Sequence, residues 1–429
     1  MKKRNESKMT MAALMMMAAM AMTSCASSKK INDGSNAGKS SEMGKNEEDL
    51  DNSYLVLSDA QQDIVKKNNA FALRLFNKVT DMESKVISPM SVSYLMGMLA
   101  NGADGITQQE ILKAIGCEGV SVSDLNELYK AMLLNANHQD KQTTVNIANY
   151  IAVNKNFKLN KDFCQKVSDS YLAGIESLDF TSSKTTDRIN GWCKEKTNGM
   201  IPRIIDQVSA DAVSYLMNAI YFKGTWQNKF NAKDTKLENF RGYTRDIQKV
   251  EMMHQVKKLF YAENKDFKAV DLPYGNGSYH MLVLLPNEGK NIQEMMKGLD
   301  EEKLNQISQN MENCMVNLKL PKFTIEQELP LNAIISDLGA PSMFVAGKAN
   351  FSHFADGNFF VSKMLQKAKI EVNEQGTKAA AVTAAVMLTA MAPEETRNVE
   401  FIADRPFVYM IQDSQSGGIL FMGQYCGTH

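Results

Sequence analysis

The sequence predicts a single α+β domain that follows an exported N-terminal segment. From about Leu55 the chain is globular for roughly 375 residues, long enough for a large core, and no internal repeat or Pro/Ser-rich linker divides it. Residues 58–79 carry apolar side chains at helical spacing, with Ser58 or Asp59 as the candidate cap. Residues 418–425 form an apolar segment typical of a strand. One domain that contains both helices and strands accounts for these observations.

The first 24 residues have the character of a bacterial export signal. Lys2, Lys3 and Arg4 supply positive charge, and residues 9–22 form an apolar run with the length of a signal-peptide core. The small residues before Cys25 resemble a bacterial lipobox, which implies cleavage before Cys25 and lipidation of its thiol. An ordinary secretory peptide with a coincidental cysteine is the alternative.

Residues 25–52 are expected to be a solvated tether. They are rich in Ser, Lys, Asn, Asp, Gly and Glu and offer almost nothing to bury. Together with a lipidated Cys25, they predict an outer-membrane protein that is attached to the membrane through its lipid alone. The residues after Cys25 leave open whether it faces the periplasm or the cell surface.

The composition excludes several classes of function. A net charge of −1 without a Lys/Arg block argues against a nucleic-acid partner. The five histidines lie outside metal-ligand spacings, and the chain has no Gly-x-Ser-x-Gly elbow, phosphate loop or dinucleotide fingerprint. We therefore expect neither an enzyme nor a cofactor. The cysteines beyond Cys25 are scattered and odd in number, so buried free thiols are expected. These thiols are Cys117, Cys164, Cys193, Cys314 and Cys426.

A segment near the C-terminus carries the most specific signal. Residues 379–392 contain no charge and follow a turn that Gly376 can form. The run is too short to span a membrane and too apolar for a flexible tail, and its Val and Thr residues weaken the case for an alanine-rich helix. Alternate residues from Thr377 onward are small, so the segment could enter a gap in a packed sheet as an added strand.

This segment resembles the hinge of the serpins, a family of serine-protease inhibitors. In that family Glu-x-Gly-Thr and further small residues precede an exposed reactive loop, and Glu374, Gly376 and Thr377 match this pattern. Other family motifs follow in order between residues 55 and 425. They include Ser88-Pro89-Met90-Ser91, the segment from Asn218 to Trp226, and Leu320-Pro321-Lys322-Phe323.

The resemblance implies a serpin fold for residues 53–429: a large central β-sheet, further sheets, surrounding helices and an exposed reactive-centre loop. It also implies suicide inhibition, in which a protease forms an acyl-enzyme with the loop and the freed hinge inserts into the sheet. Beyond Lys378, where the family more often has an acid, the hinge is small and uncharged. This favours an inhibitor over the alternative, a non-inhibitory serpin that acts as a binding or structural protein. The hinge residues are Glu374, Gly376, Thr377, Ala379, Ala380 and Ala381.

The family's usual loop length, counted from Glu374, places the scissile bond at Ala390-Met391. A small residue before the cut suits an elastase-like serine protease, and cysteine proteases are a second candidate class of target. Met387-Leu388 and Thr389-Ala390 are the alternative bonds. The resemblance thus implies a monomer whose partner is a protease.

The resemblance also assigns two clusters that control the sheet. The shutter, beneath the point where the sheet opens, comprises Ser88, Ser91, Asn218 and Gln366. Gln366 stands where the family has a histidine; it can still bridge by hydrogen bonds but cannot become charged, which puts pH-sensitive opening here in doubt. The breach, where the loop first enters, comprises Trp226, Lys322 and Glu374. We predict an ion pair between Glu374 and Lys322.

Overall fold

The computed structural model describes residues 55–377 and 396–427. These residues belong to one compact unit with the bounds Asn52–His429. Within the described ranges, no helix combines the length and the apolar character that crossing a bilayer requires. The predicted signal segment, Cys25 and the whole of the tether lie outside the described residues.

Side chains at the helix starts explain where the first helices begin. Ser58 and Gln61 form a capping box, in which each side chain accepts a hydrogen bond from the other residue's amide. The predicted helix therefore begins at Asp59. Ser88 caps the second helix, and Pro89 follows at its first position. The helices are α1 (Asp59–Val79), α2 (Pro89–Gly102), α3 (Gly105–Ala114), α4 (Val122–Asn135), α5 (Lys161–Tyr171), α6 (Lys184–Lys196), α7 (Ile292–Lys297), α8 (Glu301–Gln309) and α9 (Asn332–Asp337), with short 3-10 turns η1 (Ala232–Asp234) and η2 (Ser342–Phe344).

The hinge residues Gly376 and Thr377 are part of a six-stranded sheet. Its order is β10-β11-β12-β4-β2-β3, and β11 also pairs directly with β4. The pairing of β4 with β2 is antiparallel, whereas that of β4 with β11 is parallel. The strands are β2 (Thr143–Asn154), β3 (Gly174–Leu178), β4 (Ser214–Thr225), β10 (Phe323–Pro330), β11 (Lys363–Asn373) and β12 (Gly376–Thr377).

The second sheet has nine strands in the order β1-β15-β14-β8-β7-β6-β9-β13, with β5 paired to β6. The predicted C-terminal strand is the buried β15 of this sheet. Its strands are β1 (Lys85–Ile87), β5 (Lys236–Arg241), β6 (Ile247–Glu263), β7 (Phe267–Tyr274), β8 (Tyr279–Pro286), β9 (Glu312–Pro321), β13 (Asn398–Ile402), β14 (Phe407–Asp413) and β15 (Ile419–Tyr425).

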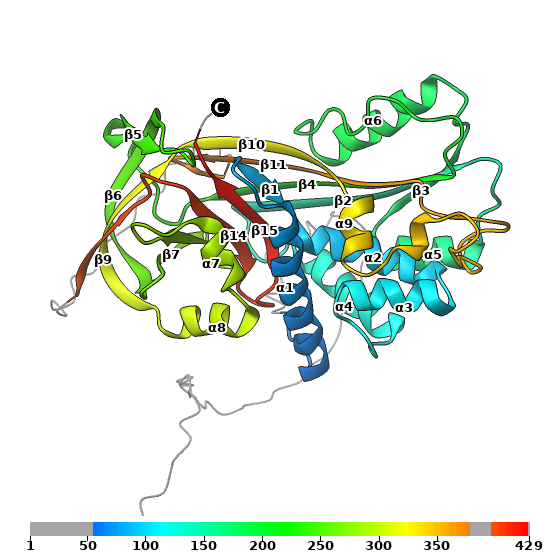
Figure 1. Cartoon of the computed structure of the whole chain (residues 1–429), viewed down its shortest axis with the longest axis horizontal. Helices are drawn as coiled ribbons and strands as arrows, with labels where there is room; N and C mark the ends of the chain where they lie inside the picture. Colours follow the sequence, from blue (N-terminus) through cyan, green and yellow to red (C-terminus); the bar gives the residue numbers. More distant parts are fainter. Residues whose placement is uncertain (1–54, 378–395, 428–429) are drawn as a thin grey trace, which may run out of the picture. The chain divides into compact units, whose positions relative to one another are not determined.

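The six-stranded sheet is covered on both faces. α6 lies on one side of it, and α2 to α5 lie on the other (Figure 1). On the α6 side, Ile189, Ile204 and Ile205 form one apolar cluster with Met217 of β4 and Leu365 of β11. Because both faces are packed, β4 is almost continuously buried along its twelve residues. A strand added to this sheet must therefore present small side chains on its inward face.

Candidate functional site

The candidate site is the seam between β4 and β11. Residues Lys363–Lys369 of β11 pair directly and in parallel with Tyr215–Tyr221 of β4. Along this stretch the two strands satisfy each other's backbone hydrogen-bonding groups. Beyond it, the two residues of β12 stand between the strands. A further strand can enter between β4 and β11 only if the seam opens.

The predicted hinge enters the sheet at the end of this seam. Gly376 and Thr377 form β12, which pairs antiparallel with the last residues of β4 on one side and of β11 on the other. Gly376 has a φ of +142°, and a Cβ there would collide with the carbonyl oxygen of Gly224. Only glycine fits this position, because it alone combines that backbone angle with so close an approach. The side chain of Thr377 is fully buried.

Thr377 contacts a tyrosine of the other sheet. Its hydroxyl lies 2.7 Å from the hydroxyl of Tyr274, at the end of β7. The Tyr274 ring stacks on Trp226, with ring centroids 4.3 Å apart and planes 13° from parallel. Trp226 in turn donates from Nε1 to the carbonyl oxygen of Asn373 at 2.9 Å. Sequence reasoning did not assign Tyr274 to the site, because the contact joins residues 103 positions apart and leaves no local pattern.

Glu374 and Lys322 form the predicted ion pair. Lys322 Nζ lies 3.3 Å from Glu374 Oε1, and the Glu374 side chain is only 12 % exposed. Thr235 donates a hydrogen bond to the same carboxylate at 2.8 Å, a contact that the sequence did not predict. Burial alone raises the pKa of Glu374, but hydrogen bonds from its own backbone and Thr235 and the charge of Lys322 outweigh burial, so the pKa lies below its usual value. The carboxylate is therefore held in its charged form.

The backbone before β12 is held as well. The amide of Trp226 donates to the carbonyl of Gln375, and the amide of Phe230 donates to that of Glu374, both at 2.9 Å. The three predicted breach residues, Trp226, Lys322 and Glu374, thus gather around one turn of the chain. The chain enters the seam directly after this turn.

The four predicted shutter residues are also close together, and all are buried. Gln366 of β11 accepts from the amide of Ser88 and donates to its carbonyl, both at 2.8 Å. It also lies 3.4 Å from Asn218 Oδ1 of β4. Ser88 donates to Ser91 at 3.0 Å. Asn149 of β2, which the sequence did not single out, accepts from Asn218 at 3.0 Å.

These shutter contacts cross the seam. Gln366, Asn218 and Asn149 are register partners on the neighbouring strands β11, β4 and β2. Their side chains form a polar row through an otherwise apolar layer, and the row is anchored to Ser88 at the start of α2. Since a strand entering between β11 and β4 must separate Gln366 from Asn218, the row adds to the barrier against opening.

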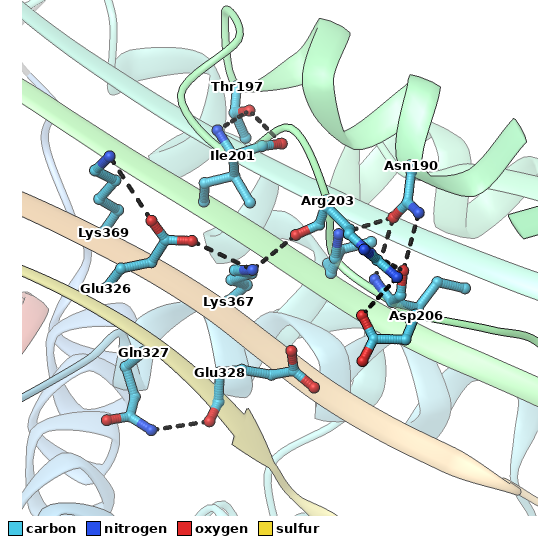
Figure 2. Close-up of polar contacts among 12 residues, drawn as sticks. Asn190, Thr197, Ile201, Arg203, Asp206, Glu326, Gln327, Glu328, Lys367 and Lys369 are labelled. Carbon is cyan, nitrogen blue, oxygen red and sulfur yellow. Dashed lines mark hydrogen bonds and ion pairs between the residues drawn. The ribbon is translucent and has the colours of Figure 1, made fainter. Parts of the chain in front are cut away.

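A segment that we call the strap, residues 197–208, covers the α6 face of the seam (Figure 2). Thr197 stabilises its first turn by accepting from the Ile201 amide at 3.0 Å. Asn190 of α6 accepts from the amides of Ile204 and Ile205, at 2.8 and 3.1 Å, and donates to the Ile205 carbonyl at 2.9 Å. One amide side chain therefore holds the strap backbone at two consecutive residues.

Lys367 connects the strap to β11. Its Nζ donates to the Arg203 carbonyl at 2.8 Å and lies 3.2 Å from Glu326 of β10 (Figure 2). Glu326 also lies 3.7 Å from Lys369. The Lys367 side chain is 16 % exposed, so this contact is shielded from solvent more than an ordinary surface ion pair. Sequence reasoning missed it, because a lysine in a strand has no distinguishing pattern.

The remaining predicted site residues lie outside the described residues. They are Ala379, Ala380, Ala381, Ala390, Met391 and Cys25. Residues 378–397 connect β12 in one sheet to β13 in the other, and 378–395 of them lie outside the described residues. After them, β13 pairs in parallel with β9.

Other side-chain chemistry is sparse in residues 55–377 and 396–427. No group of three or more His, Cys, Asp or Glu residues there could hold a metal ion. His254 lies in the long strand β6, and its Nε2 is 2.8 Å from Asn317 Oδ1. Cys117, Cys193, Cys314 and Cys426 are buried free thiols, whereas Cys164 is half-buried, so the expectation of burial is wrong for Cys164.

Comparison with known proteins gives a family for this arrangement. Residues 66–427 match the family model Serpin (serine protease inhibitor). The leukocyte elastase inhibitor of Sus scrofa is 34% identical over 374 residues, which cover 83% of this chain and 97% of that protein. Leukocyte elastase inhibitor A of Rattus norvegicus is 32% identical over 376 residues, which cover 84% and 98%.

A solved structure shows the same fold. The crystal structure of the thermophilic serpin tengpin in the native state has a TM-score of 0.79 and 31% identity, and the match covers 88% of this chain and 96% of that one. The predicted fold class, a mixed α/β serpin fold with a large sheet and further sheets, is confirmed. The family and these relatives are named as protease inhibitors rather than enzymes. The chain therefore belongs to the serpin family.

Proposed function

We propose that this serpin inhibits serine proteases by inserting its reactive loop into the six-stranded sheet. The observation that carries the proposal is the position of Gly376 and Thr377, which already pair with both β4 and β11 at the end of the seam. The loop that follows starts inside the sheet rather than beside it. A loop that only has to be exposed to a protease does not need to begin with buried residues that pair with a strand on each side.

The chemistry follows that of a serine protease with its substrate. The protease serine attacks the carbonyl carbon of Ala390, the peptide bond to Met391 breaks, and the Met391 amine leaves with the proton that the serine lost. An ester then joins Ala390 to the protease. The freed segment follows Thr377 between β4 and β11 and carries the protease along before water can hydrolyse the ester.

The dimensions are compatible with this movement. Residues 377–390 number fourteen, and a fully extended segment of that length spans about 45 Å. β4 has twelve residues and is therefore about 40 Å long. Thr377 faces the protein interior, so a strand that continued from it would place Ala379, Ala381 and Thr383 on the same face. In an inserted strand these small side chains would suit a packed layer, while Lys378 and Val382 would lie on the opposite face.

We further propose an elastase-like target, with Ala390-Met391 as the scissile bond. The support is the small residue before the bond, the absence of Lys or Arg from residues 379–392, and the similarity to two proteins named leukocyte elastase inhibitors. Met387-Leu388 and Thr389-Ala390 remain the alternative bonds, and cysteine proteases are a second class of target.

The test is incubation of residues 53–429 with pancreatic-type elastase, followed by a denaturing gel. We expect a covalent complex and a released fragment whose mass begins at Met391. A matched control, Thr377→Arg, keeps the cleavage site but places a charge in the buried slot, so it should be cut without trapping the protease. Cleavage of the natural sequence without a complex would instead support a non-inhibitory serpin with a binding or structural role. No reaction with elastase, but a complex with another protease, would overturn only the elastase assignment.

Export and anchoring form a separate proposal. We propose that residues 1–24 are removed, that Cys25 is lipidated, and that residues 25–52 tether a monomeric inhibitor domain to the outer membrane. The support is the sequence pattern alone. Labelled palmitate should be incorporated into the natural protein and not into a Cys25→Ser variant. Labelling of both, or of neither, would contradict a lipid anchor at this position.

A further inference from the structure

Tyr274 is held in place by both its backbone and its ring. Its neighbours fix the backbone, because the Gly275 amide donates to the Thr225 carbonyl at 2.8 Å and the Gln227 amide donates to the Pro273 carbonyl at 2.9 Å. These bonds connect the end of β7 to the residues that end β4. The hydroxyl of Tyr274 is thus fixed relative to the slot in which β12 lies.

The ring has little freedom to move. Trp226 stacks on one face at a centroid distance of 4.3 Å, and Phe222 meets it edge-on at 5.0 Å. A Cβ at Gly224, the β4 residue that pairs with Thr377, would lie 2.7 Å from the Tyr274 ring. The ring therefore packs directly beneath the slot. Among the residues that the structure describes, the only hydrogen bond of the Tyr274 hydroxyl is with Thr377 Oγ1, at 2.7 Å.

The Tyr274 hydroxyl is neutral in this environment. Burial raises the pKa of Tyr274, and the Thr377 hydroxyl offsets only part of that effect. A fully buried neutral hydroxyl needs a hydrogen-bond partner. If Thr377 leaves the slot, the buried Tyr274 hydroxyl loses its hydrogen bond to Thr377. The contact thus favours the state in which the hinge is already inserted by two residues.

We infer that Tyr274 is a positioning residue for loop insertion, which retains Thr377 in the sheet so that insertion starts at once and in the correct register. This inference rests on the proposed function. Adding a strand is limited by its first contacts, and the first contact is already made here. A slip of one residue would turn Lys378 and Ala380 toward the packed interior in place of Thr377 and Ala379. Slow or misregistered insertion gives water time to hydrolyse the acyl-enzyme and release an active protease.

The test uses Tyr274→Phe, which removes the hydroxyl and keeps the stacked ring. We expect the number of inhibitor molecules consumed per inactivated elastase to rise about fivefold or more, which is the effect of losing roughly one hydrogen bond. The rate at which the loop is attacked should stay the same, because residues 387–391 are unchanged. Thr377→Val should have the same effect, Thr377→Ser should restore normal inhibition, and the double variant should be no worse than either single variant.

A control and a second measurement separate this inference from the proposed function. Tyr279→Phe removes a buried tyrosine hydrogen bond of equal length, 2.7 Å to the Ala136 carbonyl, and should leave the consumption ratio unchanged. In the uncleaved protein, amide exchange of residues 374–377 should accelerate in Tyr274→Phe and not in Tyr279→Phe. Exchange that is equal in the two variants overturns the inference, whether or not any protease is trapped. Faster exchange without a trapped protease overturns the proposed function alone.

Discussion

At the scale of single residues, the site contains one neutral set of hydrogen bonds, made by Gln366, and one charged interaction, made by Glu374. Gln366 occupies a position where the family has a histidine, and it bonds both the amide and the carbonyl of Ser88. A side-chain amide does not titrate, so the hydrogen bonds between Gln366 and Ser88 do not depend on pH. Glu374 differs, because its carboxylate pairs with Lys322 and accepts from Thr235. Any acid sensitivity of the entry point should therefore come from Glu374 rather than from the shutter.

Acid should loosen the hinge through Glu374. Its pKa is lower in the folded protein than its ordinary value of 4.5, so its stabilising effect is complete above about pH 4.5 and is lost as the pH falls through the lower folded pKa. Amide exchange of residues 374–377 should consequently speed up, relative to the rest of the sheet, in acid. Glu374→Gln should remove this dependence and destabilise the hinge at neutral pH by about 1.5–3 kcal/mol. The same acid dependence in the variant would show that another group is responsible.

Reversing the charge should have a larger effect. Glu374→Lys places two ammonium groups where the structure has an ion pair of 3.3 Å and leaves the Thr235 hydroxyl without its acceptor. We expect the sheet to open early and monomers to form polymers, which a native gel after mild heating would reveal. Glu374→Gln, which is neutral and similar in size, should polymerise less. A monomer as persistent as the natural protein would argue against a restraining role for this pair.

At the scale of elements, regular segments were predictable from the sequence and the contacts between them were not. Helical spacing and a cap predicted α1 correctly, because both are local properties. The hinge motif identified Glu374, Gly376 and Thr377, but a two-residue strand such as β12 has no periodicity, so nothing indicated that it already lies in the sheet. Tyr274 and Asn149 approach the site from distant strands. Such contacts are determined by how the sheets pack, which local sequence does not encode.

The strap should loosen when Lys367 loses its charge. Lys367→Met keeps most of the aliphatic stem but removes the hydrogen bond to the Arg203 carbonyl and the ion pair with Glu326. Losing a hydrogen bond to a charged group costs about 1.5–3 kcal/mol, so amide exchange of residues 199–206 should accelerate by roughly tenfold or more. Lys363→Met, on the same strand and face, is the control and should have little effect. Equal exchange in the two variants would show that Lys367 does not hold the strap.

At the scale of the whole domain, the proposal requires a sheet that is more stable with one more strand. In the uncleaved protein, β4 and β11 pair directly, and only Gly376 and Thr377 lie between them. Full insertion would replace the direct pairing of β4 with β11 by two pairings, one between each of these strands and the inserted loop. It would also bury a row of small side chains. To complete this movement, the intact loop would have to pull β13 away from β9 of the other sheet, because its far end continues into β13. Cutting the loop removes that restraint.

Cleavage between Ala390 and Met391 should therefore raise the melting temperature of the domain. About ten additional backbone hydrogen bonds at roughly 1 kcal/mol each would stabilise the cleaved form by on the order of 10 kcal/mol. For a domain of this size, that corresponds to an increase of roughly 10–20 °C. Calorimetry of the intact and nicked protein measures the difference, and nicked Thr377→Arg, whose hinge cannot enter the slot, should show none. If the nicked natural protein melts where the intact one does, the sheet has no preference for a further strand, and inhibition by insertion is not available to this serpin.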